Sequence, residues 1–178
     1  MEHLKKNIIE LTRCSVREYS DKKKLPVAVL LDNVRSMYNV GAVFRTADAF
    51  LIEKLILTGI SGTPPHPEIK KTALGAEESV VWEYFDDALA ATIELKKAGW
   101  HICVLEQAHD SIPLQNFEAK EGVKYILIAG NEVDGVDQKI VDIADTVLEI
   151  PQHGVKHSLN VSVSVGIALW QMIKDFRL

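Results

Sequence analysis

After Pro26 the chain alternates between short apolar runs and amphipathic stretches, and this alternation restricts its fold more than any other feature. Six apolar runs have the length and composition of buried strands, at 27–32, 54–58, 79–84, 100–106, 124–129 and 146–150. Helices are expected near 39–50, 68–74, 86–98 and 137–144, and a loop over 108–122. This pattern is typical of an α/β protein with a mostly parallel sheet and helices on both faces.

The tail at 160–174, NVSVSVGIALWQMIK, begins with a period-two alternation of Val and Ser. It is too long for a typical strand, and its apolar residues also recur at helical spacing, at Val161, Val165, Ala168 and Met172. We therefore predict a helix that is apolar nearly all round and buried on most sides. Its small residues would let other backbone come close, namely Ser162, Ser164 and Gly166.

Charge is unevenly distributed along this chain of 178 residues, whose length favours one domain. Residues 1–24 carry seven Lys or Arg against four Asp or Glu, whereas the net charge of the whole chain is −5. We expect a basic N-terminal arm or helix over 1–26. From charge alone this arm could contact a phosphate backbone or be a solvated helix and linker.

Several classes of protein are disfavoured. No apolar run approaches the roughly 18 residues that cross a bilayer, and the charged N-terminus does not fit a signal peptide, so a cytoplasmic location is expected. Two cysteines, Cys14 and Cys103, cannot build a disulfide framework or a Cys-based zinc cluster. The chain has no GxxxxGK[ST], GxGxxG or GxSxG motif. His153 and His157 fit a surface or RNA-facing loop better than a metal site, and no metal is expected.

Small and polar residues gather where three expected strands end, at 39–46, 130–135 and 150–160. Ligands of open α/β sheets bind beyond the carboxyl ends of strands. The sequences are N-x-G-x-x-x-R-T-A at 39–47, G-N-E-x-x-G at 130–135 and I-P-x-x-G-x-x-x-S-L-N-V-S at 150–162. In this order and spacing they resemble the three motifs of SpoU-type (TrmH-like) RNA ribose methyltransferases of the SPOUT superfamily, over about 27–174.

The resemblance implies a SPOUT fold with a C-terminal deep trefoil knot over 27–178, a homodimer, RNA (tRNA or rRNA) as partner and S-adenosylmethionine as methyl donor. Two departures stand out. Leu51 follows Phe50 where many relatives carry Gly, and the separate RNA-binding domain of many relatives has only about 26 residues in its place.

The resemblance also assigns site residues. Catalysis or substrate positioning falls to Asn39, Arg45, Glu132, Ser158 and Asn160, and donor binding to Gly130, Ile150 and Leu159. Glu132 is expected to orient Arg45 or its own loop, and Gly41 to let the substrate backbone approach. Arg45 matches the catalytic arginine of the family, and its role as a proton acceptor or as a positioning group stays open. We favour positioning, because guanidinium stays protonated in proteins.

Without the resemblance, the same residues have simpler interpretations. Arg45 would form a surface ion pair with Asp48, and Asn39 would be the N-cap of its helix.

Two other functions compete with ribose methylation. One is an RNA-binding protein that keeps the fold without catalysis, and the other is a methyltransferase acting on a base. The full set of five polar residues disfavours the first, and the ribose-type motifs disfavour the second.

Overall fold

The computed structural model describes residues 3–7, 10, 14–156, 158–174 and 176. Its centre is a seven-stranded sheet in which every strand pair is parallel, in the order β3-β2-β1-β6-β4-β7-β5. The strands are β1 (Leu25–Asp32), β2 (Ile52–Thr58), β3 (Trp82–Phe85), β4 (Trp100–Leu105), β5 (Ile112–Pro113), β6 (Lys124–Gly130) and β7 (Thr146–Glu149). The α/β class and the parallel sheet are confirmed.

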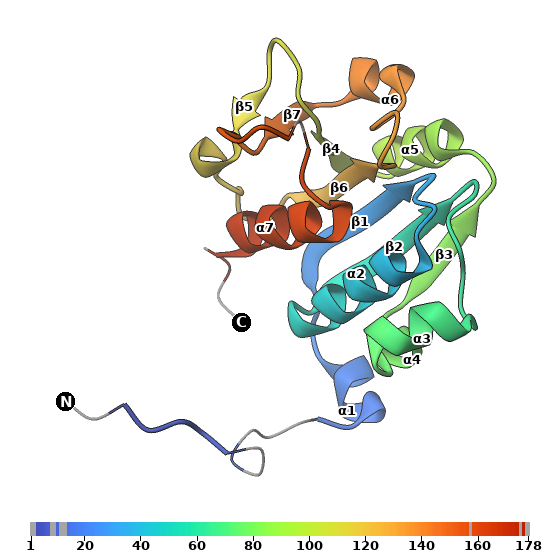
Figure 1. Ribbon diagram of the computed structural model, residues 1–178, viewed down its shortest axis with the longest axis vertical. Helices are drawn as coiled ribbons and strands as arrows, with labels where there is room; N and C mark the ends of the chain where they lie inside the picture. Colours follow the sequence, from blue (N-terminus) through green and yellow to red (C-terminus); the bar gives the residue numbers. More distant parts are fainter. Residues whose placement is uncertain (1–2, 8–9, 11–13, 157, 175, 177–178) are drawn as a thin grey trace.

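Helices cover both faces of this sheet (Figure 1). They are α1 (Val16–Asp21), α2 (Met37–Ala49), α3 (Pro67–Ala73), α4 (Ala76–Ser79), α5 (Ala88–Lys97), α6 (Gln138–Ile143) and α7 (Val161–Ile173), with a 3-10 turn η1 (Leu114–Asn116). Residues of α2, α3, α4 and α7 share one core with Val27, Val29 and Leu31. Residues of α5 and α6 share the other core with Ala28 and Leu30. Strand β1 is therefore buried on both faces, as its unbroken apolar run predicts.

Two expected elements differ from the structure. The strand expected at 79–84 is β3 at Trp82–Phe85, because 76–79 forms the short helix α4 after Gly75 at φ 96°. The expected loop at 108–122 contains β5 and η1. Strand β5 has two residues, too few for a periodic signal, and it exists through its pairing with β7.

Helix α2 begins earlier than expected, and Asn39 is not its N-cap. Ser36 caps the helix, and its hydroxyl accepts a hydrogen bond from the Asn39 backbone N–H at 3.3 Å. The expected apolar stripe is confirmed, since all four of its residues are fully buried, at Val40, Val43, Phe44 and Ala47. Leu51, which follows the helix, has φ 51°, so a leucine adopts the left-handed conformation that favours glycine.

The tail forms a helix, α7, but its burial is one-sided in the single chain. Val165, Ala168, Leu169 and Met172 are fully buried. Val163, Ile167 and Trp170 are 50%, 42% and 62% exposed, so the expectation of burial on most sides is wrong for this face. Among the described residues, no atom beyond the helix's own backbone lies within 4 Å of the position a Gly166 side chain would take, so close backbone approach there is not seen either.

The N-terminal segment is partly integrated with the main core. Tyr19 of α1 is buried in that core, and the helix is closed by a capping box between Ser15 and Glu18. Several arm residues, including Arg13, lie outside the described residues, and so does His157. The division of the chain at residue 26 and the knot both stay predictions. Within the described part of the chain, no helix has the length and apolarity to cross a membrane.

Candidate active site

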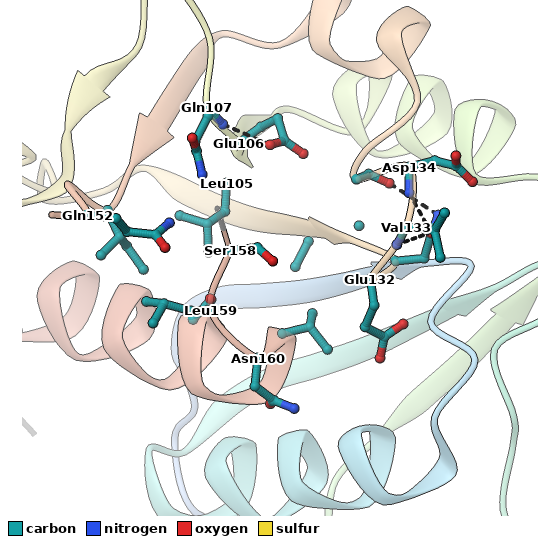
Figure 2. A pocket seen from close by; sticks show the side chains of 17 residues that line it. Leu105, Glu106, Gln107, Glu132, Val133, Asp134, Gln152, Ser158, Leu159 and Asn160 are labelled. Carbon is teal, nitrogen blue, oxygen red and sulfur yellow. Dashed lines mark hydrogen bonds between the residues drawn. The ribbon is translucent and has the colours of Figure 1, made fainter. Parts of the chain in front are cut away.

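A pocket of about 610 Å³ opens at the carboxyl ends of β4, β6 and β7 (Figure 2). Its walls are the segment 105–107 after β4, the loop 129–135 after β6, and residues from 150–164 between β7 and the first turn of α7. Ends of parallel strands are the usual place for a ligand in an open α/β sheet. The second and third sequence motifs thus meet at one pocket, as their positions after strands predict.

A chain of side-chain hydrogen bonds crosses the edge of this pocket. Asn160 Nδ2 donates to Asn39 Oδ1 at 3.0 Å, and Asn39 Nδ2 donates to Glu132 Oε1 at 2.6 Å. These residues come from the start of α7, the first turn of α2 and the loop after β6. All three sequence motifs therefore contribute to one polar cluster.

The direction of this chain follows from its last member. Asn160 Oδ1 accepts from the backbone N–H groups of Ser162 and Val163, because Asn160 is the N-cap of α7. Its amide nitrogen must then face Asn39, so Asn39 presents its oxygen to Asn160 and its nitrogen to the carboxylate of Glu132. Helix capping thus orients a side chain 121 residues away in sequence.

The loop after β6 folds back on itself tightly. Asn131 Oδ1 accepts from the backbone N–H groups of Val133 and Asp134, each at 2.9 Å. A Cβ on Gly130 would lie 2.0 Å from the carbonyl carbon of Gly135, so only glycine fits at the end of β6. Gly130 therefore serves the packing of the loop, which in turn places Glu132 at the pocket.

Most of the residues assigned from the sequence lie at this site. The lining includes Gly130, Glu132, Ile150, Ser158, Leu159 and Asn160. Asn39 joins them through its two hydrogen bonds. Glu132 was expected to orient Arg45 or its loop; its described bond is instead to Asn39.

Arg45 does not line the pocket. It is exposed on α2, six residues beyond Asn39, which corresponds to about 9 Å along a helix axis. The ion pair with Asp48, which Arg45 would form if it were an ordinary surface residue, is not among those of the described residues. Asp48 accepts instead from the Ser79 hydroxyl at 2.6 Å. The guanidinium is thus left facing solvent.

Gly41 has a different role from the expected one. A Cβ at this position would lie 2.1 Å from Thr72 Oγ1 and 2.3 Å from the Ile69 carbonyl oxygen. The close approach that glycine permits here is that of α3 against α2, and not that of a substrate. Gly41 is buried, in agreement with this packing role.

The sequence reasoning missed the pocket wall after β4, formed by Leu105, Glu106 and Gln107. The available signal was that Glu106 follows directly after a buried apolar run, as Glu132 nearly does. Strand order explains why this segment reaches the pocket: β4 lies between β6 and β7, so its carboxyl end adjoins theirs.

The charge of the lining fits a cationic ligand. Its ionisable side chains are the carboxylates of Glu106, Glu132 and Asp134, and the described lining contains no Lys or Arg. The volume lies within the range of sites for drug-sized ligands, about 300–1,000 Å³. A nucleoside that carries a positive charge matches both the size and the sign of this pocket.

Comparisons with known proteins agree with this geometry. Residues 26–170 match the model of the SpoU rRNA Methylase family. The chain is 32% identical to the tRNA (guanosine(18)-2'-O)-methyltransferase of Aquifex aeolicus, over 96% of this chain and 78% of that protein. Four further relatives are longer, and the chain spans between 56% and 66% of their length.

Two solved structures have the same fold. The TrmH/SpoU tRNA modifying enzyme of A. aeolicus superposes with a TM-score of 0.77 at 29% identity, over 88% of this chain and 78% of that one. The AdoMet-bound rRNA methyltransferase from Sinorhizobium meliloti superposes with a TM-score of 0.79 at 24% identity, over 94% of this chain and 62% of that one.

Proposed function

The chain belongs to the SpoU rRNA methylase family, and from this membership we propose that it transfers a methyl group from S-adenosylmethionine to a ribose 2′-hydroxyl of tRNA or rRNA. The observation that carries the proposal is the oriented chain Asn160–Asn39–Glu132 at the edge of an acidic, nucleoside-sized pocket. A packed core does not need such a chain at the surface. Such a chain can instead fix the orientation of a polar nucleophile beside a cationic donor.

We assign donor binding to the part of the pocket lined by Gly130, Ile150 and Leu159. Ile150 and Leu159 offer apolar surface and backbone groups to an adenine ring, and Gly130 brings the loop after β6 close to it. The three carboxylates of the lining offset the donor's positive charge. When bound, S-adenosylmethionine supplies a methyl group that its sulfonium has already activated.

The residues of the chain align the nucleophile. Transfer of that methyl group to a ribose would require the residues around it to hold the ribose hydroxyl in place and to let its proton pass to water. In this proposal Asn39 and Ser158 hold the ribose by hydrogen bonds, and the support is that Ser158 lines the pocket while Glu132 and Asn160 hold Asn39 at its edge. Fixing the two reactants in this arrangement accounts for a large part of the acceleration such enzymes reach.

Arg45 acts on the RNA and not on the donor, because it lies outside the pocket lining. Its exposed, forked guanidinium suits a bidentate grip on a phosphate next to the target ribose. This role needs no deprotonated arginine. It also explains why Arg45 forms no ion pair with the described residues of the surface around it.

A homodimer forms part of the proposal. Val163, Ile167 and Trp170 recur at helical spacing and form an exposed apolar stripe on α7, and the Trp170 ring lies 6.1 Å from that of Phe50 at the end of α2. Monomeric proteins seldom expose such stripes, and a second copy of the chain would cover it. The knot, a cytoplasmic location and contact between the basic arm over 1–26 and the RNA backbone belong to the same proposal.

The decisive experiment measures methyl transfer directly. Purified protein is incubated with unmodified tRNA and rRNA and labelled S-adenosylmethionine, and the RNA is digested for nucleoside mass spectrometry. A 2′-O-methylated nucleoside is expected with the wild type and a strongly reduced amount with Asn39→Ala. RNA binding without any methylated nucleoside would support the alternative of a catalytically silent RNA-binding protein. A base-methylated product would support the alternative of a methyltransferase that acts on a base.

A further inference from the structure

Glu106 and Asp134 are the two pocket carboxylates that take no part in the hydrogen-bonded chain Asn160–Asn39–Glu132, and Glu106 is the one that follows a strand of the sheet. It follows β4 directly, and in Figure 2 it lies across the pocket from Asn160, with its carboxylate directed toward the side of the loop that carries Val133 and Asp134. Glu132, in contrast, accepts from Asn39 at the reacting edge. The two carboxylates therefore face different parts of whatever the pocket holds.

The position of the Glu106 carboxylate is determined by backbone groups. Oε2 accepts from the Val136 N–H at 3.1 Å and Oε1 from the Gln107 N–H at 2.8 Å. A Cβ on Gly135 would lie 2.2 Å from Oε2, so the carboxylate occupies the space that this glycine leaves open. Its position is thus defined before any ligand binds.

This carboxylate retains hydrogen-bonding capacity. Two carboxylate oxygens offer about four acceptor positions, and the two backbone bonds use half of them. Glu106 also adjoins Gly130, because both pack against the backbone of Gly135 and Val136. It therefore lies beside the wall assigned to the adenosine part of the donor, away from the reacting edge.

We infer that Glu106 accepts hydrogen bonds from the ribose hydroxyls of the donor's adenosine, an inference that rests on the proposed function. A vicinal diol presents two donors side by side, which matches two neighbouring acceptor oxygens. In another class of open α/β sheets, an acidic residue at the pocket holds the ribose hydroxyl of a dinucleotide in the same way. Glu106 would thereby select ribonucleoside ligands over deoxyribonucleoside ones.

The test measures by calorimetry, without RNA, the affinities of four ligands for the full chain and two variants of it. The ligands are S-adenosylhomocysteine, 5′-methylthioadenosine, which lacks the amino acid, and the 2′-deoxy and 3′-deoxy forms of 5′-methylthioadenosine. The proteins are the wild type, Glu106→Gln, and Glu121→Gln as a matched control at an exposed site outside the pocket. Thermal unfolding checks that each variant is folded.

Glu106→Gln is expected to weaken S-adenosylhomocysteine and 5′-methylthioadenosine alike, by about 10- to 100-fold, the usual range for a hydrogen bond to a charged group. At least one of the two deoxy ligands should bind the wild type about 10- to 100-fold more weakly than 5′-methylthioadenosine does. The affinity of that deoxy ligand should fall little further in Glu106→Gln, because the hydrogen bond is already missing. Glu121→Gln should match the wild type throughout.

Three results would overturn the inference while leaving the proposed function intact. The first is equal affinity of the wild type for the ribo and deoxy ligands. The second is a loss of affinity in Glu106→Gln that is confined to S-adenosylhomocysteine, which would place Glu106 at the amino group of the ligand. The third is an equal loss of affinity for all four ligands, which would indicate a role in loop structure alone. If the wild type binds none of these compounds, the proposed donor falls and this inference falls with it.

Discussion

Both polar atoms of the Asn39 amide form a hydrogen bond, the oxygen with Asn160 and the nitrogen with Glu132, and a second amide hydrogen is left for a ligand. Asn39→Asp would place two carboxylates in contact at the 2.6 Å position and should lower the free energy of unfolding by about 1–2 kcal/mol, a lost hydrogen bond plus repulsion at a solvated site. In the double variant Asn39→Asp with Glu132→Gln, the amide introduced at position 132 can donate to the new carboxylate. Chemical denaturation should show most of the loss recovered; equal losses in the single and double variants would contradict this arrangement.

Arg45 is exposed on α2, so Arg45→Ala should keep the wild-type free energy of unfolding and the wild-type affinity for the donor. Its methylation rate should fall by roughly 100-fold, about 3 kcal/mol, if one charge-assisted contact in the transition state is lost. Initial rates of Arg45→Lys across pH separate the two roles. Near-complete loss at every pH is expected, because lysine lacks the forked geometry. Activity that rises with pH would indicate a proton acceptor, and wild-type rates in Arg45→Ala would remove the residue from the mechanism.

Helices α2 and α3 approach each other closely at Gly41, and this contact carries a prediction at the scale of the element. Gly41→Ala would overlap Thr72 Oγ1 and the Ile69 carbonyl oxygen, which is backbone and cannot rotate away. Overpacking of this kind costs about 1–3 kcal/mol or more and should exceed the gain of about 1 kcal/mol from alanine's helix propensity.

The matched control is Gly166→Ala on α7, where no atom of the described chain outside the helix backbone lies within 4 Å of the new Cβ. It should leave the free energy of unfolding unchanged or raise it by up to about 1 kcal/mol. Thermal or urea unfolding of both variants provides the measurement. A Gly41→Ala protein as stable as Gly166→Ala would show that α3 can move away from α2 at little cost.

For the whole molecule, the exposed stripe on α7 predicts the oligomeric state. Light scattering at micromolar concentration should give the mass of a dimer for the wild type. Ile167→Glu would bury a charge in the interface and should give a monomer, since an unpaired buried charge is costly. Ile93→Glu, on α5 at the opposite face of the sheet, introduces the same charge and should remain dimeric. A monomeric wild type, or a dimeric Ile167→Glu, would refute the proposed interface.

Local sequence determined the elements of this protein because their signals are local. Unbroken apolar runs mark strands such as β1 and β6, the stripe from Val40 to Ala47 marks the buried side of α2, and helical spacing marks α7. The motif residues that follow β6 and β7 line one pocket, because parallel strands bring their carboxyl ends to one edge.

Tertiary structure alone decided how those residues are used. Asn39 bonds to residues 93 and 121 positions away, and Glu106 enters the pocket because β4 lies between β6 and β7. The separation of Arg45 from the pocket and the packing role of Gly41 have the same origin. Periodicity reports which side of an element is buried, whereas these contacts depend on which elements are neighbours, and strand order is set by the packing of the whole chain.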